Sequence, residues 1–134
     1  MNNAPLLLIV EDTPALARAL SRRATSVGWK SLHASSLAEA RELVQRIAFD
    51  AWIIDRDLAG EEGMSLVREH DAAISTGTRR KRPRTALWTT APHAPPADIG
   101  DHDVAVFGKL DVEGMLSWLT DGAPQQPPRR RAVG

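Results

Sequence analysis

The stretch AWIIDRDLAGEEG, residues 51–63, decides how the rest of the sequence is interpreted. It opens with a short apolar run that is typical of a strand buried on both faces. The run ends in two aspartates one residue apart, Asp55 and Asp57, and these are followed by two glycines and two glutamates. Charged side chains directly after a buried strand indicate chemistry at the end of that strand.

The rest of the sequence alternates between strand-like and helix-like segments. Further strands are predicted over residues 6–10, 29–34, 85–88 and 104–107, and helices over residues 13–28, 37–47 and 64–74 and after Asp111. Strands that alternate with helices favour a parallel sheet covered on both faces. We therefore predict an α/β fold, a doubly wound (βα)5 flavodoxin-like sandwich around a five-stranded parallel sheet.

Two of the predicted connections have distinctive sequences. The first helix can be capped by Thr13 and carries Pro14 at its first position. Its apolar face is predicted to consist of Leu16, Leu20, Ala24 and Val27. The connection before the fifth strand contains three prolines within PHAPP, residues 92–96. Because proline interrupts helices, the fourth helix is predicted to be short or degenerate.

Length and composition limit the possible functions. The 134 residues suffice for one domain, predicted over residues 5–120, and the Pro- and Arg-rich tail over 121–134 is predicted to be disordered. Seventeen basic residues balance 17 acidic ones, so net charge indicates neither a nucleic-acid nor a membrane partner. Without cysteine, disulfides and thiolate chemistry are excluded. No apolar run is long enough for a signal peptide or a membrane span, which predicts a cytoplasmic protein.

Polar side chains follow four of the five predicted strands. They are Glu11 and Asp12, Asp55 and Asp57, Thr89 and Thr90, and Lys109. The carboxyl ends of parallel strands meet at one edge of a sheet, where ligands bind. Clustered carboxylates repel one another unless a cation lies among them, and Mg2+ is a cation that accepts carboxylate and phosphate oxygens. A lysine and a hydroxyl beside them could hold a tetrahedral anion. We therefore predict that this edge is a site where one of the carboxylates becomes phosphorylated.

Four segments together resemble a response-regulator receiver domain, the CheY-like phospho-acceptor module of two-component signalling, over roughly residues 5–120. They are LLLIVEDTP, WIIDRDLAGEEG, LWTTA and VFGKLD. Counting from Asp55 puts Leu58, Ala59, Gly60 and Gly63 on the family's alkyl, Pro-Gly and glycine positions. Counting from Asp57 aligns none of the glycines, so Asp55 is the expected nucleophile.

The resemblance implies a phosphorelay function. Asp55 would accept a phosphoryl group from a histidine kinase or phosphotransfer protein. Lys109 would pair with that group, and Thr90, which directly precedes Ala91 as in the family's motif, would donate a hydrogen bond to it. The domain would assist its own phosphorylation and dephosphorylation without being a conventional enzyme.

The resemblance also implies a Mg2+ site. Asp12 and Asp55 would bind the ion directly, Glu11 through water, and Asp57 through its backbone carbonyl. Taken without the resemblance, Glu11 and Asp12 could equally be an acidic pair at a helix N-terminus.

Several positions depart from the family pattern. Leu110 follows the lysine where the family has a cis-proline, Val106 stands where the family has a switching Tyr or Phe, and Ala59 replaces a proline. Two hypotheses follow. The chain is a stand-alone, phosphorylatable receiver with a downstream protein partner, or a degenerate receiver that acts as a phosphorylation-independent adaptor. A fragment of a longer regulator is a third possibility.

The basic segments admit a further alternative. The loop RRKRPR, residues 79–84, and the RRR of the tail could bind nucleic acid or an acidic partner. No aromatic residues are interleaved with these arginines and no pair of DNA-binding helices follows. We therefore predict solvated segments and no nucleic-acid partner.

Overall fold

The computed structural model describes residues 3–78 and 80–121. Its elements are β1 (Leu6–Val10), α1 (Pro14–Ser26), β2 (Lys30–Ala34), α2 (Leu37–Arg46), β3 (Ala51–Asp55), β4 (Asp57–Leu58), β5 (Glu61–Glu62), α3 (Met64–Ser75), β6 (Arg84–Thr89), the 3-10 helix η1 (Ile99–Asp101), β7 (Ala105–Gly108) and α4 (Val112–Asp121). The short strands β4 and β5 were not predicted. Of the predicted tail over 121–134, only Asp121 is described, and it is the last residue of α4.

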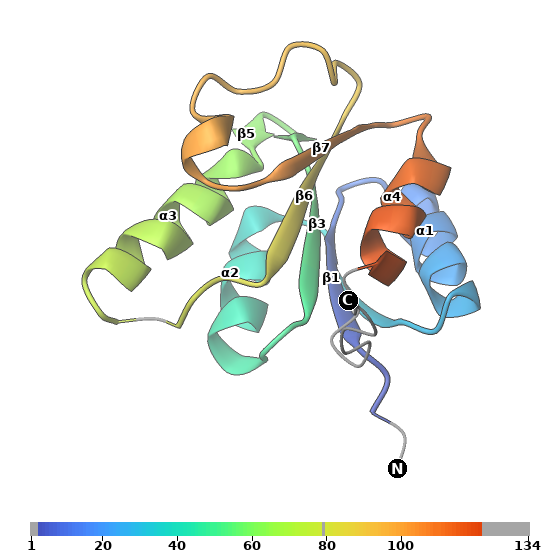
Figure 1. The fold of residues 1–134 in the computed structure, drawn as a ribbon, viewed down its shortest axis with the longest axis horizontal. Helices are drawn as coiled ribbons and strands as arrows, with labels where there is room; N and C mark the ends of the chain where they lie inside the picture. Colours follow the sequence, from blue (N-terminus) through green and yellow to red (C-terminus); the bar gives the residue numbers. More distant parts are fainter. Residues whose placement is uncertain (1–2, 79, 122–134) are drawn as a thin grey trace, which may run out of the picture.

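Five strands form one parallel sheet in the order β2-β1-β3-β6-β7. Helices α1 and α4 cover one face, and α2 and α3 cover the other (Figure 1). This arrangement confirms the predicted flavodoxin-like sandwich, whose strand order reverses between β1 and β3. Within the described ranges, no helix has both the length and the apolar character needed to cross a membrane.

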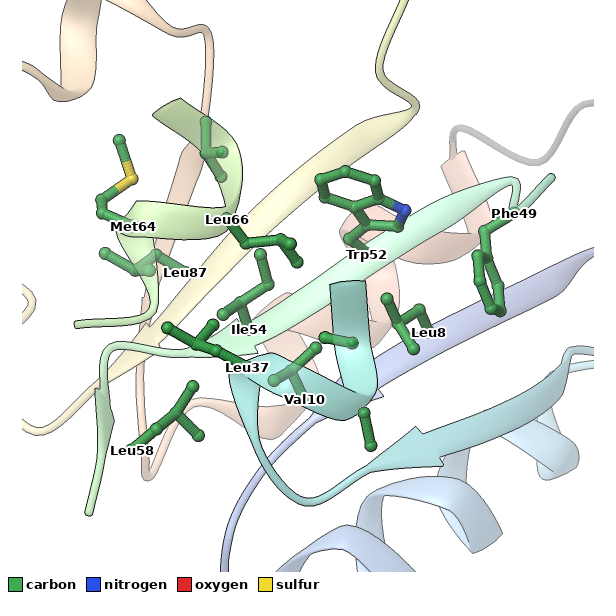
Figure 2. Close-up of a cluster of buried hydrophobic side chains, with 13 residues drawn as sticks. Leu8, Val10, Leu37, Phe49, Trp52, Ile54, Leu58, Met64, Leu66 and Leu87 are labelled. Carbon is green, nitrogen blue, oxygen red and sulfur yellow. The ribbon is translucent and has the colours of Figure 1, made fainter. Parts of the chain in front are cut away.

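The central strands carry an apolar layer on each face. All five residues of β3 are buried. Trp52 and Ile54 of β3 pack with Leu66 of α3 on one face (Figure 2). Ile53 of β3 packs with Leu20 of α1 on the other. Burial on both faces explains why the sequence of this strand is a continuous apolar run.

Helix α1 presents a different face from the predicted one. Leu20 and Ala24 are buried as expected, but Leu16 is 40% exposed and Val27 is exposed as well. The position that the prediction gave to Leu16 in the packed stripe is taken by Ala17. A helix that buries two alanines and one leucine can approach the sheet closely, which rotates the larger side chains outward.

The segment between β6 and β7 contains only the three-residue helix η1, which confirms the prediction of a short fourth helix. A set of polar side chains ties this segment to α3 and to the loop before β6. We call this set the polar clamp; it consists of Arg68, Asp71, Arg82, Asp98 and His102. Arg68 Nε lies 2.8 Å from Asp98 Oδ2, and Arg82 Nε lies 2.9 Å from Asp71 Oδ1.

The basic loop before β6 is only partly solvated. Arg82 belongs to the polar clamp. Arg84, the first residue of β6, lies over the Trp118 ring at 4.2 Å from its centroid and donates a hydrogen bond to the Trp118 carbonyl. The prediction of a solvated loop therefore does not hold for these two arginines, because their guanidinium groups stabilise the packing of neighbouring elements.

Candidate functional site

The ends of β1 and β3 bring three carboxylates together at the edge of the sheet where the strand order reverses. Glu11 and Asp12 follow β1, and Asp55 is the last residue of β3. One oxygen from each lies within 4.8 Å of the other two. Glu11 is 1% exposed and Asp55 is 6% exposed. We call these three residues the acidic cluster; the structure assembles it from residues 44 positions apart, as the sequence analysis predicted.

Lys109 reaches the acidic cluster from the edge strand β7. Its Nζ lies 2.8 Å from Glu11 Oε1 and 3.4 Å from Asp55 Oδ2. The Lys109–Leu110 peptide bond is trans, and the Lys109 amide donates a hydrogen bond of 2.8 Å to the Thr89 carbonyl. The leucine in place of the family's proline therefore does not prevent the lysine from reaching the carboxylates.

The environment of Asp55 favours its neutral form. Burial raises the pKa of this carboxyl to about 6, against an opposing hydrogen bond from the Asp57 amide, and the neighbouring charge of Glu11 raises it further. Lys109 lowers the pKa but does not cancel the other effects. A buried carboxylate whose charge is only partly compensated is the state that a bound cation relieves.

The loop after Asp55 forms a tight hairpin. Strands β4 and β5 are antiparallel, and Ala59 and Gly60 form the two-residue turn between them. Ala59 has φ +47° and Gly60 has φ +91°, which is the pattern of a type I′ turn. Proline cannot adopt a positive φ. Ala59 therefore takes a backbone conformation that the family's proline could not adopt.

Gly63 closes this loop against the backbone of Asp55. A Cβ atom at Gly63 would lie 2.1 Å from the Asp55 carbonyl oxygen and 2.7 Å from Ile54 Cγ2. The Gly63 amide donates a hydrogen bond of 2.8 Å to the Arg56 carbonyl. Any larger side chain would displace the strand end that carries Asp55, which explains the glycine eight residues after it.

The remaining predicted site residues lie nearby without joining the cluster. The side chain of Asp57 is exposed, and its amide donates a hydrogen bond of 3.2 Å to Asp55 Oδ1. Thr89 is buried, and its hydroxyl accepts a hydrogen bond from the Ala91 amide. Thr90 is exposed at the bend after β6, and its hydroxyl has no hydrogen bond within residues 3–78 and 80–121. Exposure leaves the Thr90 hydroxyl available to an incoming group.

Two contacts to the site were missed in the sequence. The Nζ atom of Lys109 lies 4.2 Å from the centroid of the Trp88 ring, and His33 Nε2 donates a hydrogen bond of 2.7 Å to the Glu11 carbonyl. Trp88 is 3% exposed and belongs to the core. The register pairs Trp88 with Asp55 across β6 and β3, so the two side chains lie on the same face of the sheet.

The donor set of the acidic cluster suits a hard divalent cation. Its oxygens are within reach of one ion, and they belong to carboxylates, the ligand type that Mg2+ prefers. No thiol exists in the chain, and within the described residues these acids are the group that could hold a metal. The cluster therefore fits Mg2+ by its chemistry.

No family model matches the sequence, and no curated protein matches it either. Solved structures are similar in fold. A CheY-like receiver domain from Methylobacillus flagellatus is 18% identical, with a TM-score of 0.76 over 90% of this chain and 99% of its own. Response regulator TrrA from Thermotoga maritima, solved in complex with Mg2+–BeF, is 17% identical, with a TM-score of 0.74 over 88% of this chain and 98% of its own. A receiver domain from Methanospirillum hungatei gives a TM-score of 0.74 at 16% identity, over 96% of this chain and 100% of its own.

Proposed function

We propose that this protein, which has the fold of CheY-like response-regulator receiver domains, accepts a phosphoryl group on Asp55 in a Mg2+-dependent phosphorelay. The donor would be the phosphohistidine of a histidine kinase or of a phosphotransfer protein. The observation that carries the proposal is the position of Lys109 Nζ within 3.4 Å of both Glu11 and Asp55, two members of the acidic cluster. This combination of three acids and one lysine is assembled from the ends of three separate strands.

The transfer itself needs few groups. An Asp55 carboxylate oxygen attacks phosphorus, a P–O bond forms, the P–N bond to the donor histidine breaks, and the released imidazole nitrogen takes up a proton. The product is an acyl phosphate. Lys109 would pair with the phosphoryl charge, and the exposed Thr90 hydroxyl would donate a hydrogen bond to it.

A bound Mg2+ would neutralise the charge that develops on the phosphoryl oxygens. Asp12 and Asp55 would hold it directly, Glu11 through water and Asp57 through its carbonyl. With a pKa of about 6, Asp55 is still roughly 90% ionised at pH 7 even without metal, so the nucleophile is available.

The direct test is phosphorylation by acetyl phosphate with and without Mg2+, followed by mass spectrometry. We expect a single phosphate on Asp55, dependent on Mg2+, and none in Asp55→Asn. Asp57→Asn is the matched control, because Asp57 is an aspartate two residues away whose side chain is exposed; it should retain the modification. Phosphate on Asp57 and not on Asp55, or none on the wild type, would contradict the proposal.

A second candidate function is that of an adaptor that binds its partner without phosphorylation. The observations that favour it are the three-residue helix η1 and Val106, a side chain that cannot act as the family's aromatic switch. Partner capture that is equal for the wild type and Asp55→Asn would support this alternative. A stand-alone domain organisation, a cytoplasmic location, a downstream protein partner and the absence of a nucleic-acid partner all remain predictions.

A further inference from the structure

We propose that Trp88 is a positioning residue: a cation–π contact with its indole ring holds the Lys109 ammonium beside the acidic cluster before and after phosphorylation. This inference rests on the proposed function. It assigns to a core tryptophan the task that the residue after the lysine performs in the family's motif. Here that residue is Leu110, which is fully exposed and contacts nothing that could direct the lysine.

The sheet register puts Trp88 directly in the path of the lysine. Trp88 pairs with Asp55 on one side and with Phe107 on the other. Lys109 directly follows β7, and its Nζ lies on the side of the sheet that carries the Trp88 ring. To reach Asp55 on β3 it must cross β6, a span of about 10 Å for two strand spacings. The Trp88 ring is the surface over which it crosses, at 4.2 Å from Nζ to the ring centroid.

The contact with Trp88 is the one that the reaction leaves unchanged. Among the described residues, the Lys109 ammonium lies close to the carboxylates of Glu11 and Asp55 and to the Trp88 ring. The two carboxylates would also serve the metal, and Asp55 would gain the phosphoryl group, so their attraction for the ammonium changes during the cycle. The quadrupole of the ring is constant, and it attracts a cation most strongly when water is excluded.

A tryptophan at this position lowers the stability of the fold in one respect in which a leucine would not. The indole Nε1 of Trp88 is buried, and it has no hydrogen-bond partner among the described residues. An unpaired buried N–H disfavours the folded state. A compensating contact is therefore expected, and the Lys109 ammonium over the ring supplies one.

The first test is NMR of the whole chain with the Lys109 side chain assigned. In the metal-free wild type the Lys109 Hε resonances should be shifted upfield by the ring, and the shift should persist after addition of Mg2+ and beryllofluoride. Trp88→Phe should keep part of the shift and Trp88→Leu should lose it. Unshifted Lys109 resonances in the wild type, or a shift that disappears with Mg2+ and beryllofluoride, would overturn the inference, even if Trp88→Leu does not fold.

The second test is the rate of phosphorylation by acetyl phosphate. Trp88→Leu should be slower by roughly 3- to 30-fold, the range expected for loss of a desolvated cation–π contact, and Trp88→Phe should recover most of the rate. Trp52→Leu is the matched control, since Trp52 is equally buried but lies on the opposite face of β3. A folded Trp88→Leu protein with the wild-type rate would overturn this inference but not the proposed function. A wild type that is not phosphorylated would overturn the proposed function, and the NMR test of the contact between Lys109 and Trp88 would still apply.

Discussion

The two halves of the site are held by different forces. The acidic cluster lies on β1 and β3, of which β3 is buried along its whole length. The segment from β6 to β7 is held by the polar clamp, and every residue of β7 is only half-buried. The half that carries the acidic cluster is thus fixed by the core. The half that carries Thr90 and Lys109 depends on polar contacts near the surface, which can be exchanged at low cost.

The carboxyl pKa values of the two halves are shifted in opposite directions. Burial raises the pKa of Asp55 to about 6. In the polar clamp, hydrogen bonds from Arg68 lower the pKa of Asp98 to about 2. Burial alone would raise the pKa of Asp71, but hydrogen bonds from Arg82 and His102 lower it overall. The acidic cluster is therefore strained by its charge without a metal, whereas the clamp is stabilised by its charge.

The largest effect is expected from Gly63→Ala. A Cβ atom 2.1 Å from the Asp55 carbonyl oxygen must displace backbone, so we expect about 3 kcal/mol of destabilisation and loss of phosphorylation. Urea unfolding and acetyl phosphate labelling measure both. Gly100→Ala in η1 is the control, because a Cβ there has open space; it should change neither quantity. A Gly63→Ala protein of wild-type stability would show that the core does not fix the acidic half.

The next largest effect is expected in how the free energy of unfolding depends on pH, which differs between the two halves. The folded pKa of Asp55 is raised from 3.8 to about 6, so the stability it contributes is complete below pH 4 and lost as the pH rises to 6 in metal-free protein. Asp55→Asn should therefore be more stable than wild type at pH 7 by about 3 kcal/mol, a gain that vanishes near pH 4. Urea unfolding in EDTA at pH 4, 5, 6 and 7 measures this.

The polar clamp should respond in the opposite direction, because its lowered carboxyl pKa values contribute stability above pH 4 that is lost toward pH 2. A wild-type protein whose stability is equal at pH 5 and pH 7 would contradict the assignment of charge strain to Asp55.

A smaller effect is expected from Asp71→Asn. It removes the negative charge and one of the two carboxylate oxygens that accept hydrogen bonds from Arg82 and His102, at a cost of about 1 to 2 kcal/mol. Hydrogen exchange should rise in residues 91–104 and stay slow in β1 and β3. Glu69→Gln is the control, since its pair with Arg41 is exposed and is worth about 0.5 kcal/mol or less. Equal exchange in both segments would mean that the two halves unfold as one unit.

The smallest effect concerns the turn after Asp55. An alanine at φ +47° is strained, so Ala59→Gly should raise the free energy of unfolding by about 0.5 to 1 kcal/mol. Ala59→Pro should lower it, because proline cannot adopt this φ. Thermal unfolding measures both changes. A stabilised Ala59→Pro would show that the loop adopts the family's conformation and not the hairpin.

Much of the fold was predictable because it follows from local pattern. Apolar runs predicted four of the five strands of the sheet, a weaker pattern over residues 29–34 predicted β2, and the prolines of PHAPP predicted the loss of a full fourth helix. The acidic cluster and Lys109 were predictable because strand ends of a parallel sheet share one edge. The rotation of α1, which buries Ala17 and exposes Leu16, was not predictable, since it depends on how closely the helix approaches the sheet.

The sequence by itself determined the alternation of strands and helices, and with it the edge at which Glu11, Asp12, Asp55 and Lys109 would meet. Only the tertiary structure decided that Lys109 crosses the Trp88 ring, that Gly63 touches the Asp55 backbone and that Ala59 turns a hairpin. The physical reason is register: which side chains face one another across strands depends on pairing between distant segments, and a one-residue slip would change every neighbour.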